Sequence, residues 1–325
     1  MDHLATVKKA GARTGPRMQT RHEYARLLRK RVFACSQLYL LLLPAVVFMF
    51  VFHYVPIYGI ILAFKEYRAV DGILGSPWVG FRNFRIFFNS YSFAVTIRNT
   101  FLLSVYGIVA GFPLPIILAI MLHHANSSKF RRTVQTITYA PHFISVVVTV
   151  GMLFVFLSPS TGVVNHAIAL FGGQRQLFMA EPRYFRHVFV WSGVWQSVGW
   201  SSIIYIAALT SIDPQQYEAA EIDGASESQT IIHIDIPGIL PTVVVLLILS
   251  MGGILSVGFE KAFLMQTPPN LSVSEVLSTY VYRRAIMGGN MHIGTTVGLF
   301  SNVINATILV LANLVARRVS EVTLF

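Results

Sequence analysis

Acidic side chains are scarce in this sequence and are concentrated in one segment. The chain of 325 residues contains 14 Asp and Glu. Six of them lie between positions 213 and 235: Asp213, Glu218, Glu221, Asp223, Glu227 and Asp235. Carboxylates gathered in this way could act as acid–base pairs, bind a metal ion or contact a basic partner. Long stretches without charged residues flank the segment, so its chemistry depends on where those stretches place it.

Catalytic and metal-binding patterns are otherwise missing from the sequence. It contains no G-x-x-x-x-G-K-[ST] loop to cradle nucleotide phosphates, no H-E-x-x-H and no G-x-S-x-G. The single cysteine, Cys35, excludes an intramolecular disulfide and a Cys-rich metal site. His123 and His124 adjoin a basic loop at the end of an apolar stretch, and we interpret them as interfacial side chains rather than metal ligands. We therefore expect no catalytic residue, no bound metal and no cofactor in this chain.

The composition indicates a membrane protein. Hydrophobic residues make up 54% of the chain, charged residues only 12%, and the mean hydropathy is +0.61. Soluble domains carry about 25% charged residues, so a soluble fold of buried helices would be left with almost no polar surface. The formal net charge of +11 could suggest nucleic acid, but 9 of the 25 Lys and Arg fall within the first 31 residues. The positive charge is therefore local, and no nucleic-acid partner is expected.

Six stretches without Asp, Glu, Lys or Arg are each longer than the roughly 20 residues that cross the bilayer core as a helix. The third stretch contains FLSPSTG, which is typical of a loop, so we end that span before Ser158. The sequence predicts an all-α membrane protein with a basic arm, residues 1–31, and a six-span domain, residues 32–325. The predicted spans are roughly 36–60, 95–123, 133–157, 187–210, 238–259 and 293–316.

The basic arm sets the predicted orientation. Positive residues next to a span resist translocation, which keeps the N-terminus in the cytoplasm. Six spans then return the C-terminus, with Arg317 and Arg318, to the same side. By this count the acidic segment, residues 213–237, lies in the cytoplasm between spans four and five.

The acidic segment carries the signals of a folded elbow. Asp213 before Pro214, with Gln216 three positions on, predicts an N-cap, a proline at the first helical position and a capping box. Gly224 can adopt a positive φ and end that helix. Ser226 with Gln229 repeats the capping signal and predicts a second helix that runs towards Pro237. A folded, charged connection indicates a docking surface, and a solvated loop is the alternative.

The same stretch carries a family resemblance. EAAEIDGASESQTIIHIDIPGILP resembles the EAA signature of membrane subunits in bacterial ABC importers, with one departure at Ile231, where the family most often has an aromatic residue. The Ile-Asp-Gly-Ala-Ser form is similar to the carbohydrate-uptake branch. VGFEKAFLM at 257–265 and STYVYR at 278–283 resemble a subgroup that imports large or acidic, alginate-like oligosaccharides. The matching residues of the signature are Glu218, Ala219, Ala220, Asp223, Gly224, Ala225, Ile234, Pro237 and Pro241.

This resemblance implies a type I ABC importer permease in the bacterial inner membrane. The EAA segment would be a coupling helix in a groove of a cytoplasmic ATPase dimer, which binds ATP and Mg. Glu218 would make a charge-assisted contact, Ala219 and Ala220 would permit close approach, and Gly224 would provide the bend. Asp223, Ala225 and Pro237 belong to the same coupling segment. A second homologous membrane subunit, a periplasmic or extracellular solute-binding protein, membrane lipid and the oligosaccharide complete the implied partners.

Polar residues in the last two predicted spans are candidates for the sugar pathway. Asn302 and Asn305 share one helical face of span six. Gly253 and Glu260 are expected close to one face of span five, with Lys261 adjacent. For the two asparagines, a role in joining helices fits equally well. The predicted outer loops are moderately basic, which favours an anionic glycan or an acidic binding protein.

An ion-coupled secondary sugar transporter, working without an ATPase, is the alternative function. Such a transporter needs titratable groups near the middle of the bilayer. The six apolar stretches contain no Asp or Glu, which argues against proton or sodium coupling.

Overall fold

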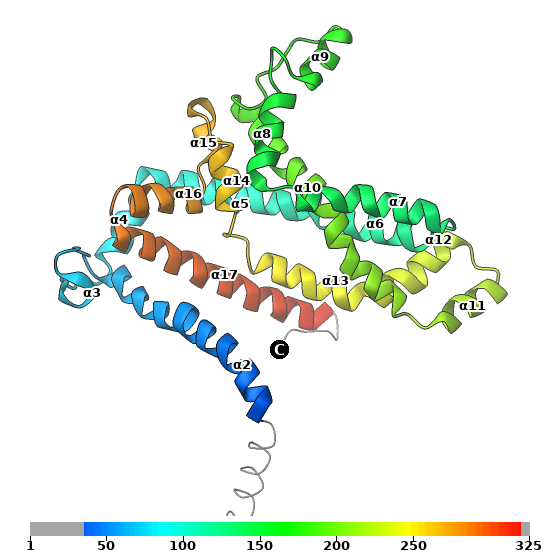
Figure 1. Ribbon diagram of the computed structural model, residues 1–325, viewed down its shortest axis with the longest axis horizontal. Coiled ribbons are helices and arrows are strands. Elements are labelled where there is room, and N and C mark those ends of the chain that lie inside the picture. The colour runs from blue at the N-terminus through cyan, green and yellow to red at the C-terminus, as the bar shows by residue number, and fades with distance from the viewer. Residues whose placement is uncertain (1–35, 320–325) are drawn as a thin grey trace, which may run out of the picture. The chain divides into compact units, whose positions relative to one another are not determined.

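The computed structural model describes residues 36–319, and every regular element in that range is helical (Figure 1). The basic arm and residues 320–325 lie outside the described range. The first elements are α2 (Ser36–Met49), η1 (Phe50–Tyr54), η2 (Val55–Phe64), α3 (Gly72–Gly75), α4 (Arg82–Phe88), α5 (Tyr91–Gly111), α6 (Pro113–His123), α7 (Ser128–Tyr139), η3 (Ala140–Phe143), α8 (Val146–Phe156) and α9 (Val163–Leu170). They are followed by α10 (Pro182–Thr210), α11 (Pro214–Ile222), α12 (Glu227–Thr230), η4 (Ile231–Asp235), α13 (Ile236–Met251), α14 (Phe259–Leu264), η5 (Pro268–Asn270), α15 (Leu271–Ser274), α16 (Leu277–Val281), η6 (Tyr282–Met287) and α17 (Met291–Val319).

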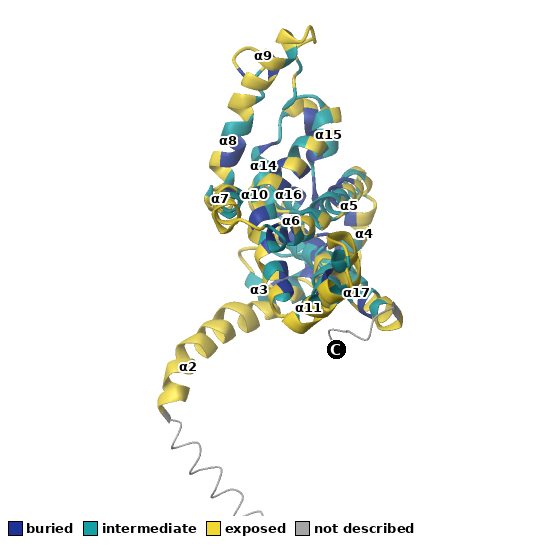
Figure 2. Ribbon diagram, turned by 90° about the vertical axis from the view of Figure 1, so that its right-hand side faces the viewer, coloured by how far each residue is buried: buried dark blue, intermediate teal, exposed yellow. Residues whose placement is uncertain are grey.

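The chain divides into two compact units, residues 1–59 and residues 60–325. In the first unit, α2 is exposed along its length (Figure 2). Its side chains are apolar on all sides, which suits a helix whose solvent is lipid rather than water. The elements from α3 to α17 belong to the second unit.

Four helical stretches are long and apolar enough to cross a membrane: residues 37–64, 91–123, 227–251 and 291–318. A fifth is obtained if the bent pair 128–143 and 146–156 is one span. α10 has 29 residues, but Ser, Gly, Gln and charged residues make it less apolar than these stretches. The all-helical fold of the described residues is confirmed, whereas six spans remain a prediction.

The third predicted span, roughly 133–157, is not one straight helix, because the chain bends sharply within it. α7 with η3 meets α8 at an angle of 101° (Figure 1). Pro141 has no N–H to continue the hydrogen-bond ladder. Ser145 is extended, with φ −63° and ψ 152°, and its hydroxyl accepts a hydrogen bond from Val148 N at 3.3 Å, which starts α8 as a new helix.

The helix in the fifth predicted span, roughly 238–259, ends earlier than expected, because α13 stops at Met251. Residues 252–255 form turns, residues 256–258 are irregular, and α14 begins at Phe259. Asn305 of α17 holds this break: its Oδ1 accepts from Leu255 N at 3.0 Å, and its Nδ2 donates to Ser256 Oγ at 3.0 Å. Glu260 therefore does not share a helical face with Gly253.

α10 is the centre of packing in the second unit, where it lies against α5, α6, α7 and α13. Val190 and Val194 of α10 and Leu103 of α5 belong to one buried cluster. α10 approaches α7 most closely at Gly199, where an added Cβ would lie 2.1 Å from the carbonyl oxygen of Thr138. Only glycine fits this contact between two helix backbones.

Replacing Gly199 should therefore destabilise the chain. In Gly199→Ala the new methyl group meets backbone rather than a movable side chain, so α7 and α10 must separate, at a cost of about 1–3 kcal/mol. We expect a lower apparent Tm of the purified chain in detergent, measured by circular dichroism. Gly151→Ala in α8 is the control, because nothing lies within 4 Å of its added Cβ. Equal Tm values for the two variants would contradict this account of the packing.

Candidate functional site

The elbow between α10 and α13 begins with a capped helix, as predicted. α11 starts at Pro214, and the Asp213 carboxylate accepts a hydrogen bond from Gln215 N at 3.0 Å. The expected capping box differs in detail, because the N–H of Gln216 bonds to the Asp213 backbone carbonyl at 3.0 Å. The carboxylate therefore satisfies one free N–H of the first turn and lies at the positive end of the helix dipole.

Gly224 ends α11 with a positive φ of 71°. The N–H of Ala225 bonds to the Ala220 carbonyl at 2.9 Å, and the N–H of Gly224 bonds to the Glu221 carbonyl at 3.1 Å. This pair of bonds is a Schellman motif, which satisfies two carbonyl groups at the end of the helix. The predicted bend is confirmed as a hydrogen-bonded turn.

The second helix of the elbow starts at the predicted capping box and leads directly into α13. The Ser226 hydroxyl accepts from Gln229 N at 3.4 Å, and the Gln229 side chain accepts from Ser226 N at 2.7 Å. Residues 231–235 form one turn of π-helix, η4, which ends two residues before Pro237. Pro237 cannot donate to residue 233, and its ring crowds that carbonyl, so a wider turn relieves the contact. The helix then continues through Pro237 and Pro241 to Met251.

The outer surface of the elbow is acidic with an apolar centre. Glu218, Ala219, Glu221 and Asp223 are exposed, and the Ile222 side chain is 86% exposed. Ala220 and Ala225 are half-buried. Figure 1 shows α11 and α12 together at one end of the second unit. An exposed isoleucine among carboxylates and alanines can be covered by a partner that supplies basic groups around an apolar hollow.

One of the six acids is not part of that exposed surface. Asp235 is fully buried, and both of its carboxylate oxygens have partners. Tyr217 Oη donates to Oδ1 at 2.6 Å, and His124 Nε2 bonds to Oδ2 at 2.5 Å. Desolvation and the hydrogen bond to Asp235 raise the pKa of Tyr217, so its hydroxyl remains a donor at neutral pH.

The roles of these residues were not apparent from the sequence. We predicted His124 as an interfacial side chain, which stays a prediction, and the structure adds that its ring is paired with Asp235 across 111 positions of sequence. The only local signal is that Asp235 lies between Ile234 and Ile236 at the start of an apolar helix. Within residues 36–319, no group of three or more His, Cys, Asp or Glu side chains is placed to hold a metal ion.

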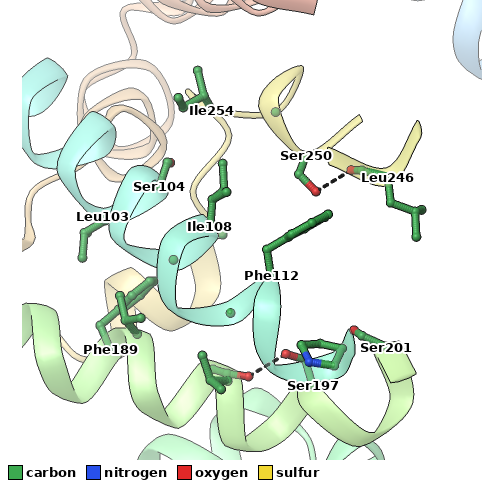
Figure 3. A pocket seen from close by; sticks show the side chains of 18 of the residues that line it. Leu103, Ser104, Ile108, Phe112, Phe189, Ser197, Ser201, Leu246, Ser250 and Ile254 are labelled. Atoms are coloured by element: carbon green, nitrogen blue, oxygen red, sulfur yellow. Dashed lines mark hydrogen bonds between the residues drawn. The ribbon is translucent and has the colours of Figure 1, made fainter. Parts of the chain in front are cut away.

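A pocket of about 600 Å³ lies between α5, α10 and α13 (Figure 3). Its walls are mainly apolar and carry hydroxyl groups from all three helices. Ser197 Oγ donates to Gly193 O, and Ser250 Oγ donates to Leu246 O, each at 2.8 Å. Because each hydroxyl donates to its own helix, its oxygen lone pairs remain for a hydroxyl-bearing ligand. Phe112 and Phe189 add aromatic surface to the lining.

Lys261 supplies the positive charge of the pocket. It lies in α14, outside the candidate spans, and its Nζ donates to the Phe189 carbonyl at 2.8 Å and lies 4.9 Å from the centre of the Phe189 ring. Burial lowers the pKa of Lys261 to about 8, so the ammonium form prevails at neutral pH. An ammonium group has three donors, so two remain for an anionic ligand.

The structure separates the five predicted pathway residues. Gly253 and Lys261 line the pocket. Glu260 and Asn302 are exposed and do not line it, and Asn305 bonds to the turn after α13. For Asn305, the geometry fits the helix-joining alternative. The hydroxyls of Ser104, Ser197 and Ser201 were not anticipated, because their convergence depends on the packing of α5 against α10.

The chain is similar to known proteins in both sequence and fold. The family of binding-protein-dependent transport system inner membrane components matches residues 111–321. The polygalacturonan/rhamnogalacturonan transport system permease protein YteP of Bacillus subtilis is 39% identical, over 87% of this chain and 88% of that protein. A crystal structure of a bacterial ABC transporter involved in import of the acidic polysaccharide alginate matches with a TM-score of 0.83 and 40% identity, over 90% of this chain and 99% of the other. A second structure, of the alginate ABC transporter with an alginate pentasaccharide-bound periplasmic protein, gives 0.83 and 39%, over 91% and 99%.

The turn at Gly224 can be tested without altering any neighbouring contact, because nothing lies within 4 Å of an added Cβ. Gly224→Val forces a β-branched residue to a positive φ, which costs at least about 1–2 kcal/mol, whereas Gly224→Asn is milder. We expect faster hydrogen exchange of the Gly224 and Ala225 amides in the valine variant and a smaller change in the asparagine variant. Unchanged exchange in the valine variant would show that the turn does not need glycine.

Proposed function

Because this chain belongs to the family of inner-membrane components of binding-protein-dependent transport systems, we propose that it is one of two membrane subunits of an ATP-driven oligosaccharide importer. The observation that carries the proposal is the exposed, hydrogen-bonded first part of the elbow, residues 213–225. The N- and C-termini and the elbow lie in the cytoplasm, where nucleotide is available. The chain itself is a non-catalytic subunit, and ATP with Mg binds to a separate ATPase dimer.

The elbow docks in a groove of that ATPase. Glu218 pairs with a basic side chain of the groove, the small Ala219 allows close approach, and the exposed Ile222 fills an apolar hollow. Asp213, Gly224 and their backbone hydrogen bonds keep α11 in one orientation, which reduces the entropy lost on docking. Asp223, Ala220 and Ala225 form the remainder of the coupling surface.

The pocket between α5, α10 and α13 is this subunit's part of the cargo pathway. Its serine oxygens accept hydrogen bonds from sugar hydroxyls, and Phe112 and Phe189 offer apolar contact to sugar rings. Lys261 binds a carboxylate of the cargo, which favours acidic oligosaccharides of the uronate type. One structural relative imports the acidic polysaccharide alginate, which supports this choice of cargo class.

The transport cycle needs three further partners. A homologous second membrane subunit completes the pathway, and a solute-binding protein delivers the oligosaccharide from outside. ATP closes the ATPase dimer, the elbow moves with it, and the pathway opens outward. Hydrolysis then returns the pathway to an inward-facing state and releases the sugar.

Docking of the elbow is tested by reversing its charge. In Glu218→Lys the charge-assisted contact becomes repulsive, and such contacts contribute about 1.5–3 kcal/mol, so the ATPase should be lost during purification through a tag on this chain. The amount of membrane-inserted chain should not change, because Glu218 is exposed. Asp71→Lys, in the exposed loop before α3, is the matched control. Normal copurification and transport in Glu218→Lys would contradict the docking role.

The cargo class is tested at Lys261. Lys261→Gln removes the positive charge of the pocket and should reduce uptake of alginate oligosaccharides into proteoliposomes by about tenfold or more, because hydrogen bonds to charged groups contribute about 1.5–3 kcal/mol. Uptake of a neutral oligosaccharide of equal length should fall much less. Arg284→Gln is the control, because Arg284 is exposed and does not line the pocket. Equal loss for both sugars would refute carboxylate recognition by Lys261.

Proteoliposomes also distinguish the alternative function. An ion-coupled secondary transporter would move the sugar without ATP and without an ATPase subunit. Such uptake by this chain alone would overturn the proposed importer.

A further inference from the structure

The buried carboxylate of Asp235 joins three segments of the chain that are far apart in sequence. Asp235 is the last residue of η4, immediately before α13. Tyr217 comes from the middle of α11, and His124 follows the last residue of α6. The hydrogen bonds from Tyr217 Oη and His124 Nε2 occupy one carboxylate oxygen each, at 2.6 and 2.5 Å. We call these three side chains the Asp235 junction.

Because Asp235 is buried, its carboxylate depends on these two hydrogen bonds. The Asp235 side chain is 0% exposed, and the His124 side chain is 18% exposed. A buried carboxylate is strongly unfavourable unless hydrogen bonds replace the water it has lost. Each partner is therefore held firmly, because loss of either bond leaves a carboxylate oxygen without a donor in a place that water does not reach.

Tyr217 is the principal attachment of α11 to the remainder of the second unit. Of the nine residues of α11, only Tyr217 and Ala220 are not fully exposed. The Tyr217 ring also lies 5.8 Å from the ring of His123, at the end of α6. The helix proposed to contact the ATPase is thus connected to α6 and α13 mainly through one tyrosine side chain.

Glu227, the other acidic residue near the Asp235 junction, is exposed rather than buried. Glu227 Oε1 lies 3.9 Å from His124 Nδ1, but its side chain is 70% exposed. An exposed ion pair at that distance contributes little. Of the six acids in the segment, Asp235 is the one that faces inward.

We propose that Asp235, Tyr217 and His124 are positioning residues that pass the movement of α11 to the ends of α6 and α13, an inference that rests on the proposed function above. A shift of α11 moves the Tyr217 hydroxyl. Because Asp235 cannot lose that bond without leaving one buried carboxylate oxygen without a donor, η4 and α6 move with it. η4 leads directly into α13, whose Leu246 and Ser250 line the pocket. The junction thus connects the docking surface with the cargo pathway.

This role separates docking from coupling. The exposed face of α11 determines whether the ATPase binds. The Asp235 junction determines whether docking of the loaded binding protein is coupled to ATP hydrolysis. Variants of the junction should therefore retain the ATPase, unlike Glu218→Lys.

The test uses the complete complex, purified through a tag on this chain and reconstituted in proteoliposomes with its solute-binding protein and alginate oligosaccharides as the probe. The measured quantity is sugar transported per ATP hydrolysed. Asp235→Asn replaces one acceptor oxygen by an N–H₂ group, and we expect this ratio to fall by about tenfold, while Tyr217→Phe, which removes only the hydroxyl, should lower it by about threefold. Copurification of the ATPase should remain unchanged in both variants.

A pair of variants at His124 distinguishes positioning from packing. His124→Gln keeps an N–H donor for Asp235 and should retain most of the coupling, whereas His124→Leu keeps the bulk without the donor and should lose it. Asp71→Asn is the control for the loss of an exposed carboxylate. Tyr217→Phe provides the test if Asp235→Asn fails to fold, because its ring contacts are retained.

The outcomes separate the two proposals. If the loaded binding protein does not stimulate ATP hydrolysis by the wild-type complex, the proposed function is overturned, and the positioning role with it. If the loaded binding protein stimulates ATP hydrolysis by the wild-type complex, but the sugar transported per ATP is unchanged in Asp235→Asn, Tyr217→Phe and His124→Leu, the positioning role alone is overturned. Loss of the ATPase from Tyr217→Phe would also overturn it, because the junction would then serve docking.

Discussion

Backbone hydrogen bonding is the constraint on which this fold depends. In hydrocarbon each N–H and C=O must be paired within the protein, so the apolar stretches form helices and every break needs substitute partners. The bend before α8 is capped by Ser145, and the end of α13 is held by Asn305 of α17. Where Pro237 removes a donor, the chain widens into η4 instead of breaking. The break after α13 adjoins the pocket, and η4 adjoins the elbow.

Backbone hydrogen bonds also determine the shape of the elbow, although the elbow is exposed to solvent. α11 has almost no buried surface of its own, so its shape comes from the Asp213 cap and from the paired backbone bonds around Gly224. A helix fixed at its ends by local hydrogen bonds can present its whole outer face to a partner. α11 is attached to the rest of the second unit mainly by Tyr217 and the buried Asp235. This small exposed helix therefore contacts α6 and α13 at one defined place.

The pocket combines weak, adaptable contacts with one strong charge. The hydroxyls of Ser197 and Ser250 already donate to their own helices and still offer oxygen lone pairs as acceptors. Lys261 is partly satisfied by the Phe189 carbonyl and ring, so its charge is stabilised and still available. Such a lining suits a cargo that must bind and then leave.

The sequence by itself determined the helical class, the capped start of α11, the turn at Gly224 and the capping box at Ser226, because each depends on residues within a few positions of one another. The EAA stretch of the sequence also indicated the protein family. Only the tertiary structure decided that α8 turns away from α7, that Asn305 holds a chain break and that Asp235 faces inward to His124. The last two outcomes depend on hydrogen bonds between residues 50 and 111 positions apart, and the spacing of residues in one sequence does not reveal such contacts.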